Sequence, residues 1–140
     1  MNILIISVAT ATARRAMQLK QLGQLGLSGE IMDAVTPKEL PVSVLDDYRF
    51  SWARPLSDVE IACALSHRKA WGIAARSKGP TLILEDDILL SNDISDVLQA
   101  ILEGPDLGYI SLEFYGQRIT LGKPLALGST VYGISRLLPY

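Results

Sequence analysis

Three consecutive carboxylates, Glu85, Asp86 and Asp87, follow the short apolar run at residues 81–84. Unit charges 4 Å apart repel by roughly 1 kcal/mol in water and about 4 kcal/mol at a protein-surface dielectric. A divalent cation would reverse that term, and oxygen ligands favour Mg²⁺ or Mn²⁺. In an extended chain Glu85 and Asp87 share one face, so we predict these two as metal ligands. The alternative is a solvated acidic loop that complements the dipole of the next helix.

A second group of reactive side chains lies upstream. Glu60 and His67 are seven residues apart, which places both on one face of a predicted helix together with Cys63. We take Glu60 and His67, the only histidine, as catalytic candidates. The alternatives are that Glu60 only closes a capping box with Ser57 and that His67 is a half-buried, satisfied ring. Cys63 and Trp71 are predicted to be core residues.

Two arginines, Arg14 and Arg15, open the first predicted helix. Cations at a helix N-terminus oppose the helix dipole, so a nearby anion would explain them. The alternative is that both are simply solvated.

The elements that must position these residues alternate between strand and helix. A buried strand reads as a continuous β-branched run, and the helix after residue 57 begins with the capping-box sequence SDVE. The order predicts an α/β domain with a mostly parallel, doubly wound sheet. We expect strands at 3–7, 30–35, 81–84, 109–114 and 128–136, a polar surface helix at 12–25, and further helices at 58–77 and 91–104. The connection at 36–57 contains three prolines, and we expect it to be irregular with at most one helical turn.

Composition limits the classes of function. The 140 residues suit a single domain over 1–140, and a net charge of −2 gives no electrostatic case for nucleic acid. One cysteine excludes an intrachain disulfide, and no apolar run approaches the roughly 18 residues of a spanning helix. We expect a cytoplasmic chain and leave peripheral attachment at the inner membrane open. Phosphate-binding loops, dinucleotide fingerprints and nucleophile elbows are absent from the sequence.

Two segments together resemble glycosyltransferase family 25, which includes bacterial lipooligosaccharide and collagen galactosyltransferases. They are RPLSDVEIACALSHRKAW and LILEDDILL, in this order and spacing. The family block Glu-Ile-Gly-Cys-x-x-Ser-His corresponds to residues 60–67, with Ala62 in place of glycine. The resemblance covers nearly the whole chain, although the SVATATA stretch after the first strand departs from the family pattern.

The resemblance implies a GT-A type, Rossmann-like fold and inverting transfer of a sugar, often galactose, from a UDP-sugar. The Glu-Asp-Asp run would bridge Mn²⁺, or Mg²⁺, to the diphosphate. Arg14, Arg15, Ser66 and Asp86 would contact the donor, and the acceptor would be a lipooligosaccharide or lipopolysaccharide glycan.

The chain ends soon after GISR, whereas family members continue, so we expect an incomplete, donor-binding part of the domain. An inverting transferase needs a general base, for which Asp93 and Glu113 are candidates only by their proximity to predicted strand ends. The alternative function is a truncated, non-catalytic nucleotide-sugar or metal-binding module. Apolar surface exposed by a missing part would favour a homo-oligomer.

Overall fold

The computed structural model describes residues 1–105, 108–112, 125–127 and 132–134. The chain divides into two compact units, residues 1–90 and residues 91–140. The first unit contains β1 (Asn2–Ser7), α1 (Thr12–Gln24), β2 (Glu30–Asp33), η1 (Pro37–Glu39), α2 (Val42–Arg49), α3 (Asp58–Ala74) and β3 (Thr81–Glu85). The second contains α4 (Ile94–Glu103), β4 (Leu125–Leu127) and β5 (Tyr132–Ile134).

The first unit is built on a three-stranded parallel sheet with the order β2-β1-β3. In its register Ser7 of β1 lies opposite Asp33 of β2, and Ile6 lies opposite Glu85 of β3. The carboxyl ends of all three strands therefore meet at one edge, which is where open parallel sheets bind ligands. The predicted α/β class with a parallel sheet is confirmed.

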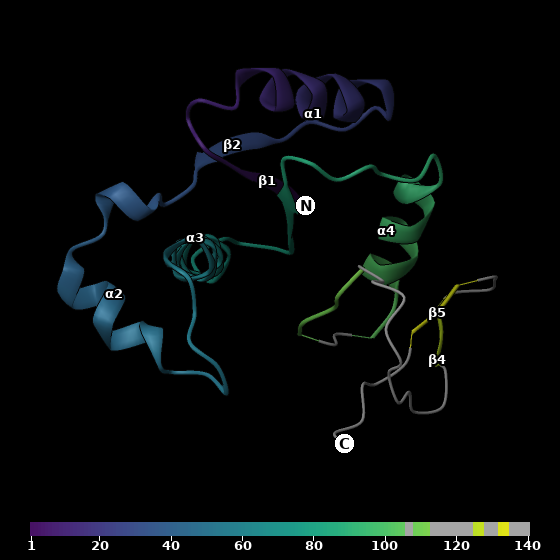
Figure 1. The fold of residues 1–140 in the computed structure, drawn as a ribbon. Coiled ribbons are helices and arrows are strands. Elements are labelled where there is room, and N and C mark those ends of the chain that lie inside the picture. The colour runs from purple at the N-terminus through teal and green to yellow at the C-terminus, as the bar shows by residue number, and fades with distance from the viewer. Residues whose placement is uncertain (106–107, 113–124, 128–131, 135–140) are drawn as a thin grey trace. The chain divides into compact units, whose positions relative to one another are not determined.

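Helices cover both faces of this sheet, as Figure 1 shows for α1 and α3. Ile3 and Ile5 of β1 pack with Leu22 of α1 on one face. Leu4 and Ile6 pack with Ala70 of α3 on the other face. Because successive strand residues point to opposite faces, a strand buried on both sides must be apolar throughout, which explains the run ILII. The resulting α/β/α layers are Rossmann-like, as expected for part of a GT-A fold.

The start of α3 follows the sequence signal closely. The Ser57 side chain accepts a hydrogen bond from the Glu60 amide at 3.3 Å, and the Glu60 carboxylate accepts one from the Ser57 amide at 2.8 Å. The capping box is thus confirmed, and the helix ends at Ala74, a few residues before the predicted stop.

The connection between β2 and α3 was predicted to be mostly irregular, and this was wrong. It contains η1 and the eight-residue helix α2. The prolines counted against helix do not interrupt these helices: Pro37 is the first residue of η1, and Pro41 is the residue before α2. A proline at a helix start costs no hydrogen bond, because that amide has no intrahelical partner.

In the second unit, α4 forms where a helix was predicted, preceded by Asp93. The predicted strand at 109–114 is wrong for residues 109–112, which are not in a strand, and its last two residues lie outside the described residues. Part of the predicted strand at 128–136 forms as β5, which pairs antiparallel with the unpredicted β4. Among the described residues, none of the helices is long and apolar enough to cross a membrane.

Candidate functional site

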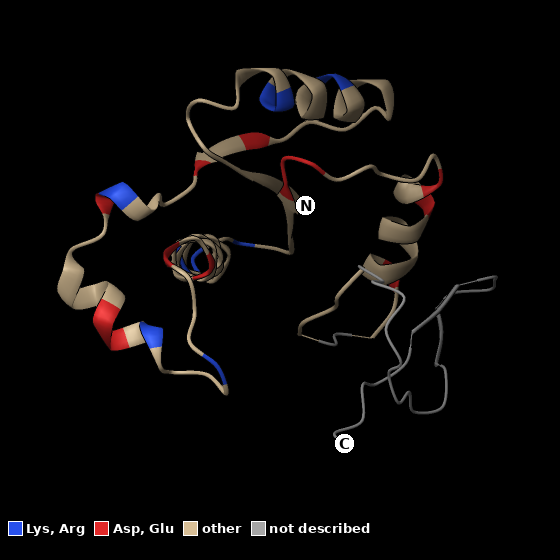
Figure 2. Ribbon diagram, in the orientation of Figure 1, with Lys and Arg blue, Asp and Glu red and all other residues tan. Residues whose placement is uncertain are grey.

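A cavity of about 270 Å³ opens at the carboxyl edge of the sheet, between β1, α3 and the acidic turn. Strand ends, the segment after β2, the start of α1 and the N-terminal part of α3 contribute its walls. Of the residues predicted to form the site, it is lined by Arg14, Ser66, His67, Glu85, Asp86 and Asp87. Arg15 and Glu60 are not among the lining residues. Figure 2 shows the acidic segment at the end of β3 and the basic start of α1.

The three consecutive carboxylates take three different environments. The extended chain ends at Glu85 and the next two residues form a turn, so the alternation assumed for an extended chain was wrong here and all three line one cavity. Glu85 Oε1 lies 2.8 Å from Nε2 of His67. Asp86 is buried, accepts a hydrogen bond from the Ser7 hydroxyl at 2.5 Å and pairs with Arg14 at 3.0 Å.

Asp87 is the exposed member of the trio. Within the described ranges it makes no hydrogen bond or ion pair. The cavity lining includes three carboxylates and one arginine, so the charges of Glu85 and Asp87 remain unbalanced once Asp86 is paired with Arg14. The cavity is therefore net negative, an environment that favours a cation and repels a bare phosphate.

Two residues beside His67 on α3 are exposed, although both were predicted to be core residues. Trp71 was predicted to be core but is 53% exposed, with its ring centroid 6.2 Å from that of His67. Cys63 was predicted to be a buried hydrophobe but is exposed toward the cavity. The reason is that the buried stripe of α3 runs through Ala62, Ser66 and Ala70, one position round from the stripe of Cys63, His67 and Trp71.

Cys63 and His67 approach Glu85 closely. One ligand atom from each of the three residues lies within 4.8 Å of the other two. Burial, followed by the negative charge of Glu85, raises the pKa of the Cys63 thiol. Both effects disfavour the charged thiolate form of Cys63.

Ser66, predicted to contact the donor, is almost fully buried. Its hydroxyl donates to the Ala62 carbonyl at 2.8 Å and accepts from the Val35 amide at 2.8 Å. It therefore ties the segment after β2 to α3, and a donor-binding role stays a prediction.

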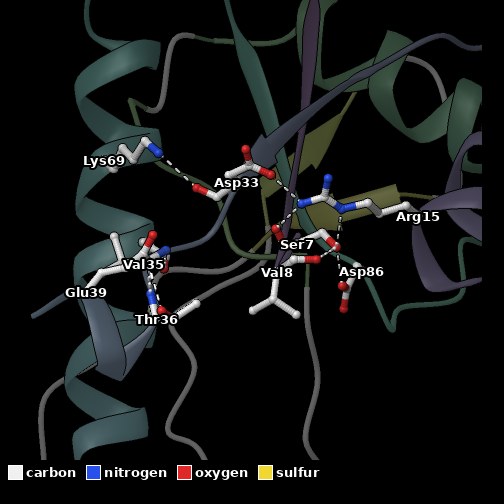
Figure 3. Close-up of polar contacts among 10 residues, drawn as sticks. Ser7, Val8, Arg15, Asp33, Val35, Thr36, Glu39, Lys69 and Asp86 are labelled. Atoms are coloured by element: carbon white, nitrogen blue, oxygen red, sulfur yellow. Dashed lines mark hydrogen bonds and ion pairs between the residues drawn. The ribbon is translucent and has the colours of Figure 1, made fainter. Parts of the chain in front are cut away.

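Arg15 joins the ends of β1 and β2 (Figure 3). Its guanidinium donates to the Ser7 carbonyl at 2.8 Å and to the Asp33 carboxylate at 2.5 Å, and its Nε donates to the Ser7 hydroxyl at 3.2 Å. The anions expected near the two arginines are thus the chain's own carboxylates, Asp33 and Asp86. Contact of either arginine with a nucleotide stays a prediction, and Arg14, half exposed in the cavity, is the better placed.

Glu60 belongs to the start of α3. Beyond its capping-box bonds, its carboxylate pairs with Arg54. The hydrogen bond from Arg54, then those from the Ser57 amide and hydroxyl, lower the pKa of Glu60 to about 2. This is the capping alternative that the sequence left open, and a catalytic role stays a prediction.

Ser7, Gln18 and Gln21 are site-supporting residues that sequence reasoning missed. Ser7 holds Asp86, and its only signal was a polar residue ending an apolar strand. Gln18 is fully buried and donates to the Ile88 carbonyl at 2.7 Å, while Gln21 accepts from the Leu90 amide at 3.0 Å. Both were assigned to a polar surface helix, because local sequence does not show that the acidic turn packs against it.

The sequence profile of glycosyltransferase family 25, an LPS biosynthesis protein family, matches residues 1–121. The chain belongs to glycosyltransferase family 25. The family assignment covers the sheet, the cavity and the acidic turn together.

Relatives within glycosyltransferase family 25 differ in their named activities. The chain is 29% identical to human inactive glycosyltransferase 25 family member 3 over 112 residues, 73% of this chain and 19% of that protein. It is 29% identical to mouse procollagen galactosyltransferase 2 over 122 residues, 80% of this chain and 20% of that protein. It is 33% identical to the lacto-N-neotetraose biosynthesis glycosyltransferase LgtE of Neisseria meningitidis serogroup B over 97 residues, 67% of this chain and 35% of that protein. The matched region thus spans only a fifth to about a third of these relatives.

Proposed function

We propose that the chain is the donor-binding part of a metal-dependent, inverting hexosyltransferase that transfers galactose from UDP-galactose to a lipooligosaccharide or lipopolysaccharide glycan. The observation that carries this proposal is the net-negative cavity at the carboxyl edge of the sheet, where Glu85 and Asp87 face the same space as Arg14. The galactosyltransferase and lacto-N-neotetraose names of two relatives support the choice of sugar and acceptor.

The donor set fits a hard divalent cation. Asp87 is exposed in the cavity, and Glu85 uses Oε1 toward His67, which leaves its second oxygen for a metal. When bound, Mn²⁺ or Mg²⁺ would stabilise the charge of the departing diphosphate. Two carboxylates from the protein and oxygens from phosphate and water form a usual environment for these ions.

The chain's own residues have separate roles in this proposal. Arg14 offers positive charge to a phosphate from its exposed half, and Asp86, held by Ser7, fixes the Arg14 side chain. His67 orients the Glu85 carboxylate through the 2.8 Å contact. The acceptor hydroxyl still requires a base. The two candidate bases stay predictions. Asp93 lies just before α4 in the second unit, and Glu113 lies outside the described residues.

The second candidate is a non-catalytic nucleotide-sugar or metal-binding module. The observation that favours it is that a relative matched over 73% of this chain is named inactive. Both candidates require metal-dependent binding of UDP, and they differ in turnover. The cytoplasmic location, and self-association as a homo-oligomer, stay predictions.

Calorimetric titration of UDP and UDP-galactose with and without Mn²⁺ tests the common part of both candidates. We expect binding only with metal, and UDP release when a glycan acceptor is added. Metal-dependent binding without release would favour the module, whereas no UDP binding under either condition would reject both.

Asp87→Asn should remove the metal-dependent part of UDP affinity, because an amide is a poorer ligand than a carboxylate for a hard cation. The fold should be unchanged, since Asp87 is exposed. The matched control is Asp47→Asn, an exposed aspartate on α2, which should bind UDP as the wild type does. Equal affinity of the Asp87→Asn and wild-type proteins would remove Asp87 from the site.

A further inference from the structure

Three side chains of different chemistry converge beside the acidic turn. Cys63 and His67 are one turn apart on α3, and Glu85 ends β3. One ligand atom from each lies within 4.8 Å of the others, and His67 Nε2 is already 2.8 Å from Glu85 Oε1. All three line the cavity.

The geometry points to a binding site for a thiophilic divalent cation of the zinc class, with Cys63 Sγ, a His67 ring nitrogen and a Glu85 carboxylate oxygen as its protein ligands. This goes beyond the proposed function, which places a hard cation on the oxygens of Glu85 and Asp87. It also does not depend on that function, because the site is defined without a nucleotide.

Sulfur, imidazole nitrogen and carboxylate oxygen are the three ligand types of tetrahedral zinc sites. Bond lengths near 2.0–2.3 Å place tetrahedral ligand atoms about 3.3–3.6 Å apart. The cysteine sulfur, which lies within 4.8 Å of the other two ligand atoms, must settle at this spacing, and the 2.8 Å His67–Glu85 contact must open slightly. Both movements need only side-chain rotation, because Cys63 is exposed and the other two side chains are partly exposed. The thiol proton passes to solvent as the metal–sulfur bond forms.

The surroundings favour these three residues over the rest of the acidic turn. Asp86 is already held by Ser7 and Arg14. Asp87 is outside the converging group, so its carboxylate is not among the proposed ligands. Three protein ligands leave the fourth position of a tetrahedral ion open toward the cavity, as in sites where zinc binds water or substrate.

Cobalt is the probe that distinguishes this site from an all-oxygen site. The whole 140-residue chain, freed of metal, is titrated with Co²⁺ without nucleotide and followed by absorption spectroscopy. We expect a thiolate-to-cobalt charge-transfer band and visible bands of tetrahedral cobalt, both abolished by one equivalent of Zn²⁺. Saturation with cobalt without the charge-transfer band would overturn the proposal.

Cys63→Ser should abolish the charge-transfer band, and both Cys63→Ser and His67→Gln should lower zinc affinity by at least about tenfold. Circular dichroism should show an unchanged fold, since neither side chain is in the buried core. Asp87→Asn is the matched control and should retain the full cobalt spectrum. Loss of that spectrum in Asp87→Asn, or wild-type zinc affinity in Cys63→Ser, would overturn the site.

The variants Cys63→Ser and Asp87→Asn separate this inference from the proposed function. Failure of the zinc site leaves Mn²⁺-dependent UDP binding and its sensitivity to Asp87→Asn intact. Failure of UDP binding leaves the cobalt spectrum and its dependence on Cys63 intact.

Discussion

Adjacent residues of this chain have different environments and contacts, and the clearest case is the pair Glu85 and Asp86. Glu85 contacts His67 at the edge of the cavity, whereas Asp86 is buried against Ser7 and Arg14. A buried carboxylate is tolerated when hydrogen bonds and an opposite charge replace its water. The acidic trio is thus one structural carboxylate with two accessible ones beside it.

Ser66 gives a residue-scale prediction about stability. Ser66→Ala should lower the free energy of unfolding by about 1–3 kcal/mol, because the Val35 amide loses its acceptor beside a buried position. Urea denaturation measures the change. Ser77→Ala is the matched control, since Ser77 only donates to the Ile73 carbonyl one turn back, and it should change stability by no more than about 0.5 kcal/mol. Equal losses in both variants would contradict the bridging role of Ser66.

Glu60 gives a residue-scale prediction about pH. Its pKa is lowered from 4.5 to about 2 on folding, so the unfolded chain takes up a proton first as the pH falls. The stability contributed by the charged form is therefore present above pH 4.5 and lost between pH 4.5 and about 2. The urea midpoints of wild type and Glu60→Gln should differ near neutral pH and converge across this range.

Arg54 provides the check on that interpretation, because its hydrogen bond is the largest cause of the lowered pKa. Arg54→Gln should reduce the pH dependence that Glu60→Gln removes. A pH dependence that is the same with and without Arg54 would point to another acid.

At the scale of elements, α1 both covers the sheet and holds the segment after the acidic turn. Gln18 binds the Ile88 carbonyl and Gln21 binds the Leu90 amide. These side chains supply hydrogen bonds that irregular backbone cannot form with itself. The position of the turn therefore depends on a helix more than sixty residues earlier in the chain.

Gln21→Ala should speed amide hydrogen exchange at Leu90, because that amide loses its acceptor. Exchange measured by NMR at single residues detects the change. Gln24→Ala, on the exposed last residue of α1, should leave the Leu90 rate unchanged. An unaltered rate in Gln21→Ala would show that Leu90 is protected by something other than this side chain.

The elements that the sequence predicts well are those specified locally. The capping box at Ser57 and the apolar run of β1 each contain the information that defines them. The helix α2 was missed because prolines stop helices only from the inside, and these lie at helix starts. The exposed positions of Cys63 and Trp71 were missed because composition does not show which face of a mostly apolar helix packs against the sheet.

At the scale of the whole molecule, the parallel sheet brings residues that are distant in the sequence to a single site. The cavity residues predicted from two separate motifs do come together, because the strands end at the same edge. The partners Ser7 and Gln21 were not predictable, since their contacts cross 79 and 69 residues respectively. Their roles depend on packing distances that no local pattern encodes.

The central place of β1 in the order β2-β1-β3 also has a consequence for biosynthesis. β1 can pair with β2 early, but its other edge waits for β3, and Ser7 lies 79 residues before Asp86. At roughly 5–20 residues per second, a ribosome needs about 4–16 s to make that stretch. During this interval one edge of an apolar strand is unpaired, which is the feature that invites aggregation. We therefore expect the nascent chain to be most prone to aggregation before the acidic turn has been synthesised.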